Sequence, residues 1–211
     1  MAPKNKFTRE EMISAAVNVV REQGADKLTA KTLAAQLGIS TQPVFTCFET
    51  MENVRSEVEN AAEKMFINYT NEAFGERIPF FGYGKRYIEF AKKEPELYRL
   101  LFLSDEKDNR AIKSMLHLQS EILPTLIGIY KISQKDAERY FRDLWLVVHS
   151  IATLFVTGGC PYSDSEIERI LTGFSISLIK SIKEIPNFTD GTFDRDAQFR
   201  SVIEKRTVDK I

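Results

Sequence analysis

The sequence predicts an all-α protein in which a head of three short N-terminal helices is joined to a larger helical bundle. Apolar residues recur at intervals of three and four along most of the chain, which places them on one face of successive helices. Several of these segments begin with a capping residue bracketed by two apolar residues, a pattern typical of helix starts. Strict alternation of apolar and polar residues never extends beyond a few positions, so no β-sheet is expected.

The first helix is predicted to begin after Thr8. Glu11 follows three residues later and completes a capping box, while Phe7 and Met12 occupy the two positions of a hydrophobic staple. Apolar residues then recur at helical spacing as far as Gly24, a residue type that readily adopts the left-handed conformation found at helix ends. One helix is therefore expected between Thr8 and Gly24.

Two shorter helices are expected next, with Gly38 in the turn between them. Thr29 is suited to cap the second helix and Ser40 to cap the third. Because helices of about eight residues are unstable alone in water, both must pack against the first helix and against each other. These three helices make up a predicted head over residues 1–50.

Residues 51–185 are predicted to form a helical body, followed by a polar C-terminal tail over residues 186–211. The first body helix has one apolar face, made by Val54, Val58, Ala61, Met65 and Tyr69. The predicted body helices run from Thr50 to about Gly75, Phe80 to Lys93, Pro95 to Phe102, Arg110 to Tyr130, Ser133 to Gly158, and from Ser163 onwards.

Three further expectations concern the body and the tail. A polar loop is expected over residues 104–109, and Pro124 is expected to kink or break its helix. The last two body helices are nearly apolar all round, so each should be covered on two sides. The tail has few aliphatic residues and either holds one weak helix from Arg195 to Glu204 or is mobile.

The composition is that of an ordinary globular protein, with 43% hydrophobic and 28% charged residues. The formal net charge is -1, so any contact with DNA must come from a local surface and not from an overall basic excess. No apolar run reaches the roughly 18 residues that span a bilayer, and the first residues lack the apolar core of a signal peptide. A cytoplasmic protein without a membrane partner is expected.

The second and third helices have the spacing of a helix-turn-helix, in which the later helix lies in the major groove of DNA. The residues expected to be exposed on that helix are Thr41, Gln42, Pro43, Phe45 and Thr46. Glutamine can form two hydrogen bonds with adenine, and threonine can donate to a base edge or contact a thymine methyl group. The alternative is a tight three-helix corner with no role in DNA binding.

Residues 8–54 resemble the DNA-binding head of the tetracycline-repressor (TetR) family of transcriptional regulators. The matching residues are Ala15-Ala16, Gly24, Leu28-Thr29, Leu33-Ala34, Leu37 to Ser40, Phe45, Phe48 and Val54. The resemblance implies a homodimer that binds double-stranded operator DNA. It also implies DNA-backbone contacts from Thr29, Lys31 and Phe45, and base contacts from Thr41, Gln42, Pro43 and Thr46.

The sequence departs from this family pattern at three positions. Phe45 replaces the usual tyrosine, Cys47 a common histidine, and Met51 the usual lysine. Each replacement removes a phosphate contact, so DNA binding should depend less steeply on salt than in relatives, unless Lys4, Lys6 and Arg9 compensate. These losses also support an alternative function, a helical interaction protein whose head no longer binds DNA.

The body resembles the regulatory domain of a subgroup of this family named for a Trp-His-Gly signature. The resemblance rests on residues 95–102 together with Trp145, His149 and Gly158, although Ser150 stands where the signature has glycine. It implies a pocket for a small-molecule effector, lined by Tyr87, Phe90, Phe102, Met115, His117, Trp145 and His149. Alternatively, these side chains simply fill the core of the body.

No enzymatic, metal or cofactor site is expected. Cys160 and His149 suggest a nucleophilic hydrolase only weakly, because no third orienting group or strained elbow accompanies them. His117, His149 and the cysteines lack the spacing of metal ligands, and neither Cys47 nor Cys160 lies in a CxxC motif.

The last two body helices are the expected surface of the homodimer. Gly173 and Ser177, four residues apart, would permit the close approach of a partner helix, although they can equally pack within one subunit. Two heads are needed because one short helix discriminates too little among DNA sequences. The sequence therefore predicts a ligand-responsive regulator that an effector releases from a pseudo-palindromic operator, and the family resemblance implies a repressor.

Overall fold

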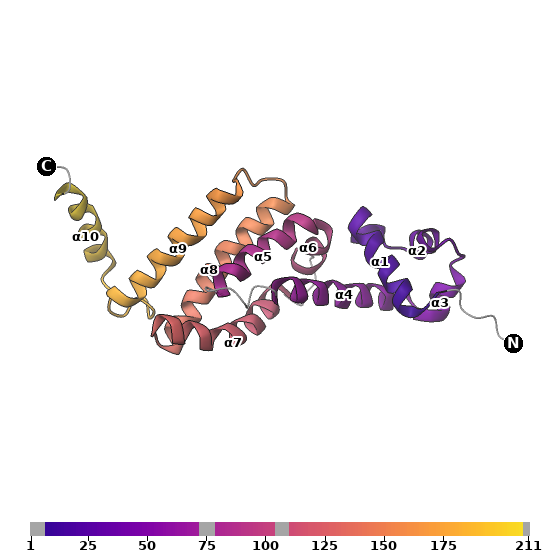
Figure 1. Ribbon diagram of the computed structural model, residues 1–211, viewed down its shortest axis with the longest axis horizontal. Coiled ribbons are helices and arrows are strands. Elements are labelled where there is room, and N and C mark those ends of the chain that lie inside the picture. Colours follow the sequence, from indigo (N-terminus) through magenta and orange to yellow (C-terminus); the bar gives the residue numbers. More distant parts are fainter. Residues whose placement is uncertain (1–6, 72–78, 104–109, 209–211) are drawn as a thin grey trace.

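The computed structural model of the 211-residue chain describes residues 7–71, 79–103 and 110–208. Within these ranges all regular secondary structure is helical, which confirms the predicted all-α fold class. The molecule is elongated, with the three-helix head at one end, the bundle in the middle and the last helix at the far end (Figure 1).

The head begins with α1 (Arg9–Gln23), which starts as predicted. The Thr8 hydroxyl accepts the Glu11 amide at 3.2 Å, and the Glu11 carboxylate accepts the Thr8 amide at 2.7 Å, so the capping box is complete. Gly24 ends the helix with φ of +88°, and a short 3-10 turn, η1 (Ala25–Lys27), follows. The start and the end of the first helix are therefore set by local sequence.

The second helix, α2 (Ala30–Leu37), is capped by Thr29 as predicted, with Thr32 as the reciprocal partner in the capping box. Gly38 then adopts φ of 64° and ψ of 38°, a left-handed conformation that costs little for glycine. The Ile39 amide donates back to the Ala34 carbonyl at 3.0 Å, which closes the turn.

The prediction that Ser40 caps the third helix is wrong. Helix α3 (Gln42–Phe48) follows Thr41, whose backbone is already helical and whose side chain makes no capping hydrogen bond. The Thr41 carbonyl accepts the Val44 amide at 3.1 Å, so the helix starts one residue later than expected. Pro43 explains this start, because its fixed φ suits the first turn and its missing amide needs no partner there.

Two residues connect α3 to the next helix, α4 (Met51–Asn71). Glu49 has φ of 64° and ψ of -50°, and the Thr50 amide donates to the Phe48 carbonyl at 2.7 Å, which is the geometry of a γ-turn. The side-chain amide of Asn53 donates to the same carbonyl at 2.8 Å. A non-glycine residue at positive φ is strained, and these hydrogen bonds hold it in place.

Helix α4 runs from the head into the body (Figure 1). Its buried residues are Val54, Val58, Ala62, Phe66 and Thr70. The predicted apolar face is correct at Val54 and Val58. Beyond them, each buried residue lies one position later in the sequence than predicted. Ala61, Met65 and Tyr69 are only partly buried, and the predicted end near Gly75 lies outside the described residues.

The body is built around α8 (Gln134–Val156), which packs against α5 (Pro79–Lys93), α7 (Arg110–Tyr130) and α9 (Asp164–Glu184). A side-chain carbon added at Gly84 of α5 would lie 3.1 Å from Val148, so glycine permits the close approach of α5 and α8. Helix α6 (Pro95–Phe102) has the predicted bounds, and α7 continues through Pro124 without ending. The predicted loop at residues 104–109 lies outside the described part of the chain.

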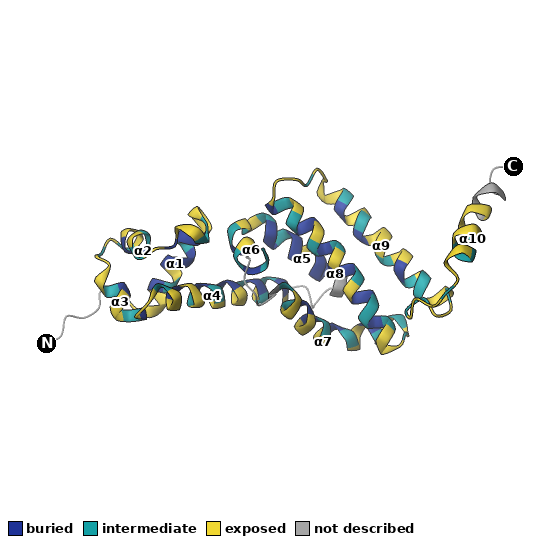
Figure 2. Ribbon diagram, turned by 180° about the vertical axis from the view of Figure 1, so that it is seen from behind, coloured by how far each residue is buried: buried dark blue, intermediate teal, exposed yellow. Residues whose placement is uncertain are grey.

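The last body helix, α9, begins with the predicted Ser163–Glu166 capping box, but it is covered on one side only. Ile167, Leu171 and Leu178 are buried, whereas Phe174 and Ile176 are 47% and 49% exposed. Figure 2 shows more buried residues on α8 than on α9, although α8 carries exposed residues as well. The expectation of two-sided cover is therefore met by α8 and is wrong for α9 within a single chain.

The tail forms a helix, α10 (Arg195–Val208), which decides between the two alternatives for this segment. The residues before it are anchored to α8: Arg139 donates to the Phe188 carbonyl and lies 4.2 Å from its ring centroid, and Lys135 pairs with Asp190. Helix α10 itself stands apart from the bundle (Figure 1), and Phe199 is 69% exposed.

Candidate nucleic-acid interface and effector site

Helix α3 is held by two buried side chains and presents most of its other residues outward. Val44 and Phe48 are 0% and 2% exposed and pack into the core of the head. The predicted base-contacting residues therefore lie where a partner can reach them: Thr41, Gln42, Phe45 and Thr46 are exposed, and Pro43 is half-buried. Phe45, at 44% exposure, is a large apolar side chain left on a surface.

The polar groups of α3 differ in how far the chain already satisfies them. The Thr46 hydroxyl donates to the Gln42 carbonyl at 3.0 Å, so its hydrogen is used within the helix. The Gln42 side-chain amide and the Thr41 hydroxyl have no hydrogen bond in the part of the chain that the structure describes. These two groups remain available to a partner.

Two of the three residues predicted to contact the DNA backbone, Thr29 and Lys31, lie at the start of α2. Lys31 is exposed in its first turn, close in sequence to the α2 cap. The Thr29 hydroxyl accepts the Thr32 amide at 3.1 Å and lies 3.0 Å from the Thr32 hydroxyl, so it serves first as a helix cap. Of the two α2 residues, Lys31 is thus the better placed to reach a phosphate.

Arg9 does not provide a free cation on the head. Its guanidinium lies 4.6 Å from the Phe48 ring centroid, donates to the Cys47 carbonyl at 2.9 Å and pairs with Glu57 at 2.7 Å. The hydrogen bond with Glu57 raises the pKa of Arg9, which stays charged. Arg9 therefore ties α1 to α3 and α4, and its expected compensating role is not supported, while Lys4 and Lys6 lie outside the described residues.

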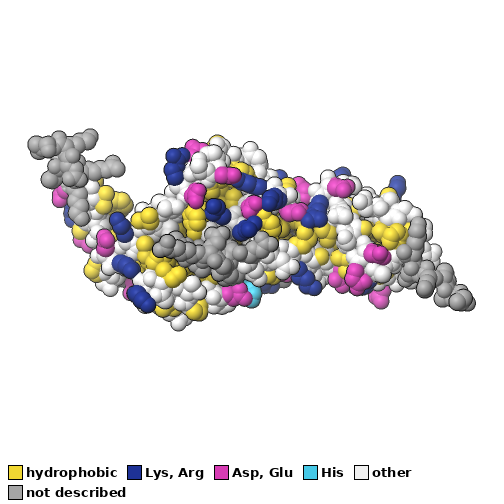
Figure 3. Space-filling model, in the orientation of Figure 1, with side chains coloured by type: hydrophobic (Ala, Val, Ile, Leu, Met, Phe, Trp, Pro, Cys, Tyr) yellow, Lys and Arg dark blue, Asp and Glu magenta, His cyan; other side chains and the backbone are white. Residues whose placement is uncertain are grey.

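Two of the three positions where the family pattern has polar residues are packing positions here, and the third, Phe45, is exposed. Cys47 and Met51 are both half-buried and lie against the core of the head. Lys and Arg side chains are scattered over the body and the head on the face in Figure 3, and they do not gather on the head. The candidate interface therefore consists mainly of uncharged polar and apolar side chains, with few basic ones.

The head is joined to the body by α1 as well as by α4. Helix α1 packs against α6, and Arg21 forms two hydrogen bonds with Glu94, at 2.6 and 2.8 Å. Glu94 immediately precedes α6. A displacement of α6 would consequently also displace α1, the first helix of the head.

An aromatic–histidine cluster lies where α4, α5, α6 and α8 meet. Each ring has a neighbour with its centroid within about 6 Å, as in T-shaped or stacked aromatic pairs. The cluster comprises Phe66, Tyr87, Phe90, Tyr98, Phe102, Trp145 and His149.

His149 is the polar centre of this cluster. Its Nδ1 lies 2.9 Å from the Tyr87 hydroxyl and 3.1 Å from the Tyr98 hydroxyl, and its ring stacks on Trp145 at 4.8 Å. Burial lowers the pKa of His149 and raises the pKa of both tyrosines, so all three groups are uncharged. When the ring proton is on Nε2, Nδ1 accepts a hydrogen bond from a tyrosine hydroxyl.

The structure brings together five of the seven residues predicted to line an effector pocket. Met115 is buried on α7 in the same hydrophobic core but is not one of the stacked rings, and His117 is exposed, with its Nε2 3.6 Å from Glu121. Phe66 and Tyr98 were missed by the sequence analysis. Tyr98 lies within the segment that carries the family resemblance, whereas Phe66 required the correct helical face of α4.

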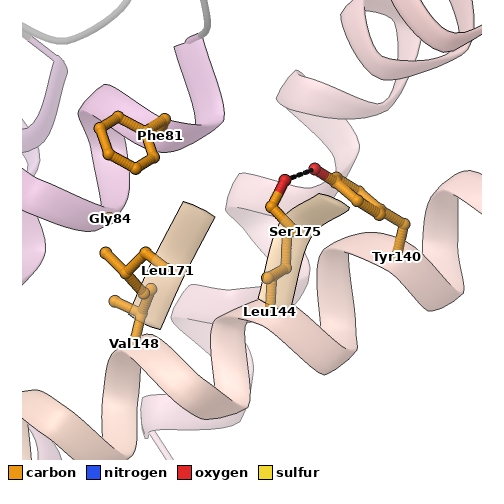
Figure 4. Close-up of a pocket in the computed structure, with 7 residues that line it drawn as sticks. All are labelled: Phe81, Gly84, Tyr140, Leu144, Val148, Leu171 and Ser175. Carbon is orange, nitrogen blue, oxygen red and sulfur yellow. Dashed lines mark hydrogen bonds between the residues drawn. The ribbon is translucent and has the colours of Figure 1, made fainter. Parts of the chain in front are cut away.

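Two cavities between the body helices are small in the conformation described. Figure 4 shows one between α5, α8 and α9, of about 20 Å³, where the Tyr140 and Ser175 hydroxyls lie 2.6 Å apart. A second, of about 40 Å³, lies between α4, α5 and α7 beside Tyr83 and His117. Such volumes hold a water or two, so a larger molecule would require side chains to move.

No group of three or more His, Cys, Asp or Glu side chains among the described residues is arranged to hold a metal ion. None of the described helices is both long enough and apolar enough to cross a membrane.

Comparison with known proteins relates the chain to solved structures. No family model matches the sequence, and no curated protein is significantly similar to it. A protein of unknown function from Rhodococcus sp. RHA1 superposes with a TM-score of 0.66 and 18% identity, over 86% of this chain and 99% of that one. A candidate transcriptional regulator from Pseudomonas aeruginosa PAO1 gives 0.66 and 11%, over 84% and 95%.

A third similar structure carries a family name. It is a TetR-like transcriptional regulator from Rhodococcus sp. RHA1, with a TM-score of 0.60 and 13% identity, over 81% of this chain and 97% of that one. The three structures match nearly their whole lengths to this chain. The protein therefore has the fold of the TetR-like transcriptional regulators.

Proposed function

We propose that this protein is a ligand-responsive, TetR-like transcriptional regulator that binds a pseudo-palindromic operator as a homodimer. The observation that carries the proposal is the outer face of α3. The side chains of Gln42 and Thr41 have no hydrogen-bond partner within the described chain, and Phe45 is exposed beside them. A short helix held from behind by a three-helix head is the geometry that enters the major groove.

An exposed apolar surface on α8 and α9 of the body supports the homodimer. Leu146 and Leu154 of α8 are 50% and 38% exposed, and Phe174 and Ile176 of α9 are about half exposed. A side-chain carbon added at Gly173 would meet no atom within 4 Å, so that part of α9 is open for the close approach of another helix. Packing α8 and α9 against a second copy would bury these apolar side chains and place two heads on one duplex.

The aromatic–histidine cluster is the proposed effector site. Apolar rings with a few polar groups at the centre are typical of small-molecule sites, and His149, Tyr87 and Tyr98 provide those polar groups. Phe66 joins the cluster to α4, which carries the head. An effector that separates these rings would bind best to a conformation in which α4 is displaced. By linkage, it would oppose operator binding.

Selection from random duplex DNA tests this function. The purified protein should enrich a motif with two-fold symmetry, and a footprint on that motif should show two protected half-sites. Gln42→Ala should weaken binding by about tenfold, since a good two-bond base contact is worth roughly 1–3 kcal/mol. Lys64→Ala, an exposed change on the body half of α4, serves as the matched control.

The second candidate is a helical interaction protein whose head does not bind DNA. It is favoured by the engagement of Arg9 with Glu57 and by the burial of Cys47 and Met51 where relatives have phosphate-binding residues. The same selection separates the two functions. If no sequence is enriched even at low salt, the interaction protein becomes the better account.

A further inference from the structure

The outer face of the recognition helix lacks the side chains that most often select guanine or cytosine. No Lys, Arg, Asp or Glu occurs between Ile39 and Phe48. Arginine and lysine make the commonest specific contact with guanine, and acidic side chains accept from the cytosine amino group. The helix is therefore left with an amide, hydroxyls and apolar groups for reading bases.

Gln42 is the group on α3 that can form a two-bond contact. Its side chain is exposed and makes no hydrogen bond within the described chain, so its amide oxygen and nitrogen are both available. This pair matches the N6 donor and N7 acceptor that adenine presents in the major groove. The Thr41 hydroxyl can form one hydrogen bond with several bases, so it adds little discrimination.

Thr46 offers a methyl group more readily than a hydrogen-bond donor. Its hydroxyl hydrogen is directed to the Gln42 carbonyl, at 3.0 Å, and is not free to bind a guanine acceptor. Phe45 is 44% exposed, and the Pro43 ring is partly exposed. These three side chains form an apolar surface, and thymine is the base that presents a methyl group in the major groove.

We infer that α3 selects A·T base pairs, with adenine against Gln42 and thymine methyl groups against Thr46, Phe45 and Pro43. The inference rests on the proposed DNA binding and specifies the class of operator sequence. The centre of each half-site, where α3 lies, should thus be rich in A·T pairs. The inference sets no requirement on the flanking base pairs, which would face α2 and the backbone contacts.

The composition of the selected half-sites gives the first test, and a synthetic duplex gives the second. Replacing thymine by uracil at the position facing Thr46 removes only the methyl group. The dissociation constant, measured by fluorescence anisotropy, should rise about fourfold, the equivalent of one buried methyl-sized group. Replacing adenine by 7-deazaadenine opposite Gln42 should weaken binding by about tenfold in wild type and have little effect in Gln42→Ala.

Two variants of Thr46 separate the methyl group from the hydroxyl. Thr46→Val keeps a methyl surface and lacks the hydroxyl, so it should still prefer thymine to uracil. Thr46→Ser keeps the hydroxyl and lacks the methyl group, so the preference should disappear. Val44 and Phe48 anchor the helix in both variants, and equal thermal unfolding midpoints would show that the head remains folded.

The possible outcomes are distinct. Half-sites with G·C pairs at the centre, or equal affinity for thymine and uracil duplexes, would overturn the A·T inference and leave DNA binding intact. Failure to enrich any motif would overturn the inference together with the proposed function. A·T centres, with loss of thymine preference in Thr46→Ser but not in Thr46→Val, would support it.

Discussion

The pair formed by Arg21 and Glu94 should couple the head energetically to the body. It joins α1 to the start of α6 through two hydrogen bonds, of 2.6 and 2.8 Å. The two side chains are 34% and 23% exposed, so the pair is partly shielded from water. Parallel charge-assisted hydrogen bonds of this kind are stronger than single surface contacts.

The expected coupling free energy follows from this geometry. Fully exposed pairs contribute about 0.2–1 kcal/mol, and a two-bond, partly shielded pair should exceed that range slightly. We expect about 1–1.5 kcal/mol at low salt, falling as salt screens the charges. The value is modest because both side chains lose hydration and rotational freedom in forming the pair.

A double-mutant cycle measures this coupling. Urea unfolding of wild type, Arg21→Ala, Glu94→Ala and the double variant gives the free energy that the two residues share. A matched cycle on Lys85 and Glu168, each 54% exposed and 3.8 Å apart, should give less than about 0.3 kcal/mol. Equal coupling in the two cycles would refute the idea that Arg21–Glu94 links head and body.

Three further predictions concern stability. Gly38→Ala should destabilise the fold by about 1–2 kcal/mol in urea unfolding, since φ is 64° there and no atom lies within 4 Å to add a clash; an unchanged midpoint would contradict this. Tyr98→Phe should cost about 1 kcal/mol because it removes the hydrogen bonds to the part-buried His149 and Thr153, while Tyr162→Phe, on an exposed ring, should cost less than about 0.5 kcal/mol. Burial lowers the pKa of His149, so the unfolded chain takes up the proton first; stability should be full above about pH 6.5 and decline as pH falls from there towards the folded pKa. His149→Gln should flatten this dependence, and an identical pH profile in the variant would count against it.

Helix starts were predictable where the capping chemistry is local. Thr8, Thr29 and Ser163 each cap the expected helix, because the interacting groups lie within three residues of one another. Ser40 failed because two neighbouring hydroxyl residues could begin α3, and the turn geometry with Pro43 decided between them. Sequence spacing alone does not distinguish two such adjacent starts.

The buried faces and the candidate site were predicted only in part. Trp145 and His149 stack as their four-residue spacing suggested. In α4, two adjacent apolar stripes exist, and packing against the body selected the one containing Phe66 rather than Met65. The buried face of α7 was displaced in the same way: His117 is exposed, and the next residue, Leu118, is buried instead. Such choices depend on tertiary contacts between segments far apart in the chain.

The strained turn at Glu49 has a mechanical consequence. Only Glu49 and Thr50 separate α3 from α4, and both the Thr50 amide and the Asn53 side chain fix the Phe48 carbonyl. This connection is too short and too constrained for the two helices to move independently, so α3 must move with α4 as one rigid lever. From Phe66, in the body, to Met51 the helix is about 22 Å long at 1.5 Å per residue.

A tilt of about 10° at the body end would therefore carry α3 through about 4 Å. This distance exceeds the roughly 3.4 Å between successive base pairs along a DNA strand. A rearrangement of a few aromatic rings around His149 is thus large enough, at the far end of the lever, to move the recognition helix out of register by a whole base pair.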